Sequence, residues 1–220
     1  MKLPRLYAIL DAGFFPHADA LFAAAHELAA GGCTLIQYRN KSGNARVMLE
    51  HARRLRQRFP QSQNPHPVAK SATRVGQPSV RLIMNDRADL CLAAEFDGVH
   101  VGQDDLSPEA VRAIIGPDRW LGVSTHNPEQ LREADLTSAD YFAIGPVFVT
   151  SSKEKPDPVV GFEGVRRARI LTRKPLVAIG GITRANAASV IEAGADSVAV
   201  ISDLIQDPRK SAEEFFRILG

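Results

Sequence analysis

The chain has 220 residues, of which 45% are hydrophobic, and its 27 basic and 25 acidic residues leave a net charge of +2. This length fits one large domain or two small ones, and the apolar fraction is sufficient for a sizeable core. Balanced charge argues against nucleic acid, no apolar run approaches the ~20 residues that span a bilayer, and no signal-peptide pattern is present, so we expect a cytoplasmic protein without membrane partners.

Short apolar runs alternate with helix-like segments from end to end. The runs are rich in Val, Ile and Leu at successive positions, which is typical of parallel strands buried on both faces. The sequence predicts eight strands, near residues 5–10, 34–39, 81–86, 98–102, 120–125, 141–145, 175–180 and 197–201.

The segments between these runs carry local helix signals. Ser107–Pro108, Asn127–Pro128 and Asp207–Pro208 each place a capping side chain before a proline at the first helical position. Thr183 is predicted to cap a helix over 186–193. Over the whole chain the predicted number of helices is eight.

Strands and helices in strict alternation predict the α/β class and a single TIM barrel, (β/α)8, over residues 1–220. The alternative is an open doubly wound sheet. A dinucleotide-binding sheet of that kind carries a glycine-rich turn after its first strand. Here that turn reads Leu10-Asp11-Ala12-Gly13, and a glycine pair follows the seventh strand instead. We therefore predict the barrel.

Residues 59–79 interrupt the alternation with four prolines among Gln, Ser and Asn. In a barrel this segment joins a helix to the next strand, on the face opposite the active site. The composition predicts a polar, Pro-rich insertion that is exposed to solvent.

Polar residues follow most of the predicted strands, and the carboxyl ends of parallel barrel strands meet at one rim. Gln37, Arg39 and Lys41 alternate along a strand end, so their side chains are expected to point the same way. Two cations beside an amide suit a pyrophosphate group, since Arg binds it bidentately and Lys adds a point charge. A solvated strand end explains the same residues equally well.

Acidic side chains follow the next two strands. Asp86, preceded by Asn85, and Asp105 can meet at one Mg²⁺ ion, which proteins bind through one or two carboxylates and substrate phosphate oxygens. The alternative for Asp86 is a helix cap. Asp105 lies too early for that role, because Ser107 fills it.

Two further segments suit phosphate. The long loop that begins at Gly145 and includes Lys153 carries hydroxyls and a cation, although an ordinary polar loop has the same composition. Gly180–Gly181 and Ile201–Ser202 end the seventh and eighth strands, where barrels often bind phosphate through backbone N–H groups. His100 is expected inside the barrel, and His126 is a weak catalytic candidate.

Together these motifs, in this order and spacing, resemble the thiamine-phosphate synthase family over nearly the whole chain. The matching residues are Gln37-x-Arg39-x-Lys41, Asn85-Asp86, Gly98 to Asp105, Gly122-Val123-Ser124-x-His126, Gly145 to Lys153, and Gly180-Gly181-Ile182. The insertion at 59–79 is the main departure from the family pattern.

The resemblance implies a Mg²⁺-dependent transferase of thiamine biosynthesis. Its members join 4-amino-2-methyl-5-(diphosphooxymethyl)pyrimidine to thiazole phosphate and release pyrophosphate. The implied pyrimidine-diphosphate site is Gln37, Tyr38, Arg39, Asn40, Lys41, Asn85, Ser124 and Lys153. The implied thiazole-phosphate site is Thr150, Ser151, Ser152, Gly181, Ile201 and Ser202. Asp86 and Asp105 would bind the metal, and Arg39, Lys41, Ser124 and Lys153 would be catalytic.

Three alternatives stay open on the residues. Thiazole tautomerase shares the fold but uses a histidine and lacks the magnesium acids. A barrel that only binds a phosphorylated ligand would share the phosphate loops. An aldolase-like or isomerase barrel would be favoured by a Schiff-base lysine within a strand, and the predicted strands contain none.

Overall fold

A computed structural model describes residues 1–61, 79–150 and 157–220. Within these ranges eight parallel strands pair in chain order and close into a barrel, because β8 (Ser197–Val200) pairs with β1 (Leu6–Asp11). The remaining strands are β2 (Leu35–Arg39), β3 (Arg81–Asn85), β4 (Gly98–Val101), β5 (Trp120–Thr125), β6 (Tyr141–Ile144) and β7 (Leu176–Ile179). The predicted barrel is confirmed, and closure rules out the open sheet.

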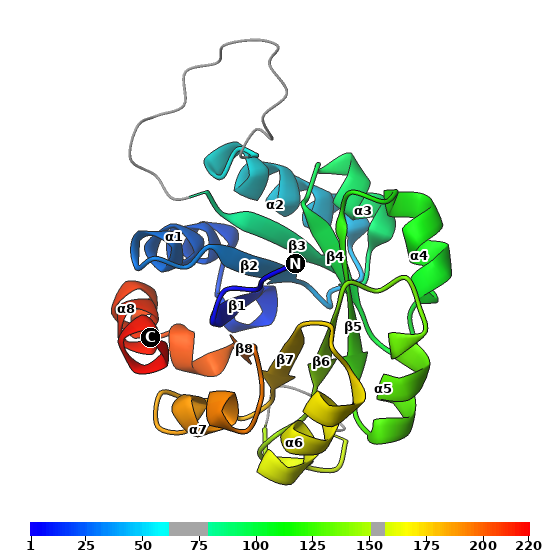
Figure 1. The fold of residues 1–220 in the computed structure, drawn as a ribbon. Coiled ribbons are helices and arrows are strands. Elements are labelled where there is room, and N and C mark those ends of the chain that lie inside the picture. Colours follow the sequence, from blue (N-terminus) through cyan, green and yellow to red (C-terminus); the bar gives the residue numbers. More distant parts are fainter. Residues whose placement is uncertain (62–78, 151–156) are drawn as a thin grey trace, which may run out of the picture.

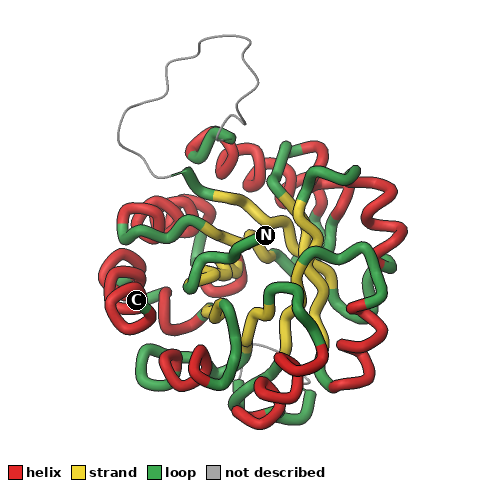
Figure 2. Tube along the Cα trace, viewed as in Figure 1, coloured by secondary structure: helices red, strands yellow, loops and turns green. Residues whose placement is uncertain are grey.

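Helices surround the barrel as an outer layer (Figures 1 and 2). They are α1 (Ala18–Ala30), α2 (Ala45–Arg58), α3 (Ala88–Ala93), α4 (Pro108–Ile115), α5 (Pro128–Asp135), α6 (Gly161–Leu171), α7 (Ala187–Glu192) and α8 (Pro208–Leu219). Two short 3-10 helices, η1 (Ala12–Phe14) and η2 (Ser202–Leu204), follow β1 and β8.

The helix starts predicted from capping side chains are confirmed in three places. Ser107, Asn127 and Asp207 each accept a hydrogen bond from a backbone N–H in the first turn of their helix. Thr183 does not cap α7, so that prediction is wrong. Asn186 is the N-cap residue, and its Oδ1 accepts from the Thr183 N–H at 2.8 Å, which holds the preceding turn instead.

The strands bury side chains on both sides, as the continuous apolar runs predict. In β1, Tyr7 and Ile9 face the barrel interior, and the residues between and beside them pack against the helices. The interior layer is completed by Leu35, Ile83, Tyr141, Ala143, Val177 and Ala199. The two tyrosines make this interior more polar than the branched aliphatic filling usual in such barrels.

Three aspartates at the amino-terminal face of the barrel repeat one arrangement. Asp97, Asp140 and Asp196 each precede an even-numbered strand. Each accepts the N–H of the first or second residue of the preceding strand at 2.7–2.8 Å. Each also pairs with an arginine from the helix layer, at 2.7 Å in all three cases. The repeat ties strand pairs to helices on the face away from the candidate site.

We expect Asp97→Ala to lower the free energy of unfolding by about 3 kcal/mol, because it leaves both the Leu82 N–H and the Arg56 guanidinium without their acceptor. The side chains of Arg56 and Asp97 are only 10% and 15% exposed. Urea denaturation measures the change, and kcat should stay near the wild-type value. The matched control is Asp19→Ala. Its ion pair with Arg54 is exposed, so a loss below about 1 kcal/mol is expected.

Residues 62–78 lie outside the described ranges, but both flanking segments are described. Phe59, which the sequence assigns to the insertion, is buried and belongs to the barrel. Gln61 donates from Nε2 to the Glu95 carbonyl at 2.9 Å, and Val80 is buried just before β3. Both flanks therefore lie at the amino-terminal face.

Replacement of residues 62–78 by a short Gly/Ser linker is expected to change kcat/KM less than about threefold, since loop length alters closure entropy slowly. Steady-state kinetics with both substrates measures this. A large rise in KM for either substrate would show that the segment reaches the opposite rim.

Candidate active site

The carboxyl ends of the strands bring the predicted polar residues to one rim of the barrel. Gln37 and Arg39 lie on β2 and Asn85 ends β3. Asp105 follows β4, and Ser124 lies on β5. Neighbouring strands are in parallel register here, with Asn85 opposite His100 and Ser124 opposite Ala143. Residues far apart in sequence therefore share one site.

Two cationic side chains at this rim are already paired with acids. Lys41 Nζ lies 2.5 Å from Asp86 Oδ2, and the lysine side chain is 55% exposed. Arg39 forms an ion pair with Asp11, a buried residue at the end of β1. Asp11 was not among the predicted site residues, although it ends an apolar strand as they do. An anionic ligand at this rim would meet both cations.

Tyr38 and Asn40 are directed differently from Gln37 and Arg39. The Tyr38 hydroxyl lies 3.0 Å from Nδ1 of His51 in α2, and Asn40 Nδ2 donates to that hydroxyl at 2.9 Å. Their side chains therefore serve the contact between β2 and the helix layer. This agrees with the strand alternation that separates them from Gln37, Arg39 and Lys41.

The two carboxylates predicted to bind metal are close neighbours. Burial raises the pKa of Asp105, and the negative charge of Asp86 raises it further. The hydrogen bond from the Gly102 N–H acts in the opposite direction and lowers it. Asp86 has a φ of 63°, a left-handed conformation that aspartate tolerates better than most residues. Arg87, not Asp86, is the N-cap residue of α3, so the helix-cap alternative is wrong.

Asn85 carries an unsatisfied donor at the same rim. Its Nδ2 is buried and has no hydrogen-bond partner among the described residues, and the residue is only 8% exposed. Buried polar atoms are nearly always paired, so an orphan atom calls for a missing partner. A ligand oxygen beside Asp86 would supply it.

Ser124 is held from inside the barrel. Its Oγ lies 2.9 Å from His100 Nε2, and His100 Nδ1 lies 3.1 Å from the Tyr141 hydroxyl. The predicted interior position of His100 is confirmed, and burial lowers its pKa to about 4. Tyr7 and Tyr141 gave no sequence signal, because each sits within an apolar strand.

The glycine pair after β7 is required by the loop after β6. Val147 N–H donates to the Ile179 carbonyl at 2.8 Å, and Phe148 N–H donates to the Gly180 carbonyl at 3.0 Å. Gly181 has a φ of 64°, and a Cβ on it would lie 2.6 Å from the Val149 carbonyl oxygen. Thr150 ends the described part of this loop. Ser151, Ser152 and Lys153 lie outside the described residues.

The eighth strand contributes a short helix start. Ile201 precedes η2, which begins at Ser202, and its carbonyl accepts from the Leu204 N–H at 3.2 Å. Within the loop after β7, Asn186 Nδ2 donates to the Gly181 carbonyl at 3.1 Å. Because β7 pairs with β8, Gly181 and Ser202 follow the ends of adjacent strands, as predicted. None of the eight described strands contains a lysine, which disfavours Schiff-base chemistry on a strand.

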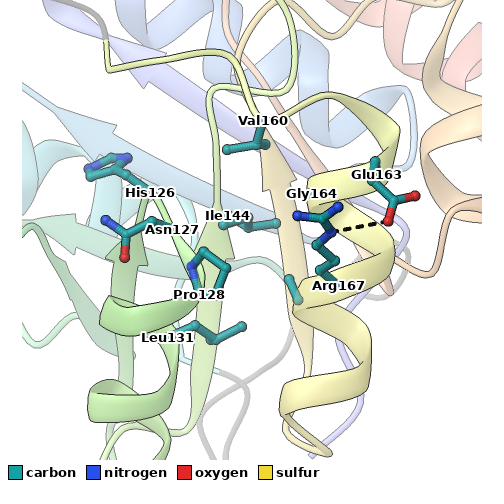
Figure 3. A pocket seen from close by; sticks show the side chains of 10 residues that line it. His126, Asn127, Pro128, Leu131, Ile144, Val160, Glu163, Gly164 and Arg167 are labelled. Carbon is teal, nitrogen blue, oxygen red and sulfur yellow. Dashed lines mark hydrogen bonds and ion pairs between the residues drawn. The ribbon is translucent and has the colours of Figure 1, made fainter.

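His126 follows β5 and lines a cavity between α5 and α6. The cavity has a volume of about 220 Å³ and apolar walls that include Leu131, Ile144 and Val160 (Figure 3). His126 Nδ1 lies 2.6 Å from the Gly145 carbonyl oxygen and 3.5 Å from Asp157. The ring is therefore tied to the loop after β6.

The fold and the rim together define the class of protein as a closed (β/α)8 barrel with a polar site at its carboxyl-terminal face. This site contains two cations paired with aspartates, two neighbouring carboxylates and a glycine pair after β7. A family model for thiamine monophosphate synthase matches residues 6–204. The chain belongs to this family.

Individual relatives agree. The chain is 57% identical to a thiamine-phosphate synthase of Koribacter versatilis, over 100% of this chain and 97% of the relative. It is 41% identical to one from Chloroflexus aurantiacus, over 91% and 85%. Among solved structures, a thiamine phosphate pyrophosphorylase from Pyrococcus furiosus matches with a TM-score of 0.78 and 32% identity, over 98% and 95%. No helix in the described ranges is both long and apolar enough to cross a membrane.

Proposed function

We propose that this chain is a thiamine-phosphate synthase of the cytoplasm. It joins 4-amino-2-methyl-5-(diphosphooxymethyl)pyrimidine to thiazole phosphate and releases pyrophosphate. Family membership supports the assignment. The observation that carries it is the rim cluster in which Lys41 lies 2.5 Å from Asp86, beside the orphan donor of Asn85. That cluster suits a diphosphate better than a single phosphate.

Asp86 and Asp105 fit a Mg²⁺ ion on the chemistry of their site. Burial and the negative charge of Asp86 raise the pKa of Asp105, and a cation between the two carboxylates would offset both effects. Mg²⁺ needs only one or two carboxylates beside substrate phosphate oxygens. Among the described residues no group of three or more His, Cys, Asp or Glu side chains that could hold a metal ion is found. When bound, the ion supplies positive charge beside the leaving group.

The chain's own cations stabilise the departing pyrophosphate. Electron donation from the pyrimidine amino group lets the C–O bond to the diphosphate break, and the bonding pair leaves with the oxygen. Arg39, Lys41 and, as the family resemblance implies, Lys153 stabilise the developing negative charge, the stage at which preorganised donors contribute most. Asn85 Nδ2 adds a hydrogen bond to the same group.

The second half of the reaction is bond formation at a carbocation. The thiazole nitrogen supplies the electron pair to the exocyclic methylene carbon, so no strong protein base is required. Thr150, Ser151, Ser152, Gly181, Ile201 and Ser202 hold the thiazole phosphate through hydroxyls and backbone N–H groups. Gln37, Ser124 and the backbone near Tyr38 and Asn40 hold the pyrimidine. Fixing both rings supplies most of the proximity advantage.

A coupling assay tests the proposal. Purified protein is incubated with both substrates and Mg²⁺, and thiamine phosphate and pyrophosphate are quantified. The two products are expected in equal amounts. Omission of either substrate should remove both products. A protein that binds the substrates without forming thiamine phosphate would be a phospho-ligand-binding barrel. Isomerisation of the thiazole without coupling would identify a tautomerase.

A further inference from the structure

Five polar side chains form one continuous hydrogen-bonded chain through the barrel interior. Gln37 Nε2 lies 2.8 Å from the Tyr7 hydroxyl, and the Tyr7 and Tyr141 hydroxyls are 3.0 Å apart. Tyr141 continues to His100 Nδ1 at 3.1 Å, and His100 Nε2 reaches Ser124 Oγ at 2.9 Å. The two ends of this hydrogen-bonded series, Gln37 and Ser124, both lie at the rim.

The backbone makes room for this chain. A Cβ on Gly122 would lie 2.1 Å from Tyr141 Cζ and 2.4 Å from His100 Nδ1, so the two rings occupy the space that a side chain at residue 122 would take. Barrel interiors are normally filled with branched aliphatic residues, and buried polar groups destabilise a fold unless each is satisfied. A polar chain here therefore indicates a role beyond packing.

Which group donates in each of these hydrogen bonds follows from the orientation of the Gln37 amide. Each hydroxyl donates a single hydrogen, and a neutral histidine carries a hydrogen on one ring nitrogen only. Because Gln37 Nε2 donates to Tyr7, Tyr7 donates to Tyr141 and Tyr141 donates to His100 Nδ1. His100 then carries its hydrogen on Nε2 and donates to Ser124 Oγ.

This direction decides what the two ends present to a ligand. Gln37 is left with Oε1, an acceptor, beside the second hydrogen of Nε2, and Ser124 is left with its hydroxyl hydrogen, a donor. A reversed amide would reverse every link, so that Gln37 would donate and Ser124 would accept. The two ends are thus coupled through the barrel interior, although they belong to β2 and β5.

We propose that Tyr7, Tyr141 and His100 are positioning residues that fix Gln37 as an acceptor and Ser124 as a donor toward the substrate. The inference rests on the proposed function, whose pyrimidine has an amino group beside a ring nitrogen. Gln37 Oε1 accepts from that amino group, and the Ser124 hydroxyl donates to a ring nitrogen. An analogue with an oxo group in place of the amino group swaps donor and acceptor along this edge and is rejected.

The experiment compares affinities for the 4-amino pyrimidine diphosphate and its 4-oxo analogue by titration calorimetry with Mg²⁺. Wild-type protein is expected to prefer the amino compound on the order of 100-fold, since a wrong partner leaves buried polar groups unpaired. Tyr141→Phe keeps the ring and interrupts the chain, so the preference should fall at least about tenfold. Tyr7→Phe should do the same, because it frees the Gln37 amide to turn.

The matched control is Thr125→Val. It removes a buried hydroxyl from the same strand as Ser124, but that hydroxyl donates to the Ala143 carbonyl at 2.9 Å and lies outside the chain. The control should keep the wild-type preference even if its melting temperature falls. A purely structural role for the tyrosines would weaken both ligands equally and leave the preference unchanged.

Folded Tyr141→Phe and Tyr7→Phe proteins that keep the wild-type preference would overturn the inference. If Tyr141→Phe does not fold by circular dichroism, Tyr7→Phe decides the matter alone. A wild-type protein that forms thiamine phosphate yet binds both compounds equally removes this inference and leaves the proposed function intact. A wild-type protein that binds neither compound removes both.

Discussion

Asp86→Asn and Asp105→Asn should each lower kcat/KM for thiamine phosphate formation by on the order of 100-fold or more. Each substitution keeps the side-chain volume but removes one negative charge from the pair proposed to bind Mg²⁺. Asp86→Asn also removes the acid that faces Lys41 at 2.5 Å. Full kinetics at varied Mg²⁺ concentration, with and without EDTA, would measure the loss.

The neighbouring residue provides a matched control for this experiment. Asp104 is exposed, whereas Asp105 is half-buried and accepts the Gly102 N–H at 2.7 Å. Asp104→Asn changes the net charge by the same amount, so it should stay within about twofold of wild type if only local charge matters. Full turnover by EDTA-treated, metal-free wild-type protein would rule out the metal assignment, as would equal losses in the Asp104 and Asp105 variants.

Arg39→Ala is the second large expected effect, with a loss in kcat on the order of 100- to 1000-fold. The guanidinium is proposed to face the pyrophosphate as its charge develops. Arg39→Lys should recover only part of the activity, because a point charge cannot replace bidentate contacts. Single-turnover measurements would separate this chemical step from substrate binding.

His126→Ala is the comparison that separates synthase from tautomerase. Its ring is tied to the Gly145 carbonyl, beside the cavity between α5 and α6, and charge stabilisation matters more than proton transfer in the coupling reaction. A loss below about tenfold is therefore expected, at the low end of general acid–base effects. An inactive His126 variant together with a near-normal Arg39 variant would contradict the synthase proposal.

Folding must be checked for the Arg39 variants. Arg39 pairs with Asp11, whose side chain is only 5% exposed, so Arg39→Ala leaves a buried carboxylate without its cation. Thermal unfolding by circular dichroism distinguishes a destabilised protein from a folded, inactive one. Asp11→Asn with Arg39→Ala removes the unpaired charge and should restore stability but not activity.

Much of the architecture is determined by local signals in the sequence. Continuous apolar runs predicted all eight described strands to within two residues at either end. Ser107–Pro108, Asn127–Pro128 and Asp207–Pro208 predicted helix starts correctly, because an N-cap bonds only to its own first turn. The prediction that Thr183 caps α7 was wrong, because α7 begins later, at the N-cap residue Asn186. The Asn186 side chain instead accepts the Thr183 N–H, three residues before it.

The position of the candidate rim was also predictable. Polar residues that end parallel strands must meet where those strands end, whatever fills the core. This rule brought Arg39, Lys41, Asp86 and Asp105 together before any contact was known. The same rule predicted that Gly181 and Ser202 lie near each other, because they follow β7 and β8, which are adjacent in the barrel.

Tertiary structure alone decided the contacts across the barrel. Tyr7 and Tyr141 are 134 residues apart, and their hydroxyls meet only because closure brings β1 and β6 to one interior. The register of the adjacent strands β1 and β2 places Asp11 opposite Arg39, 28 residues away, and so selects it as the partner. Sequence patterns record which face a side chain takes, but not which distant side chain it meets. Those pairings depend on register and barrel curvature, which arise only when all the strands are in place.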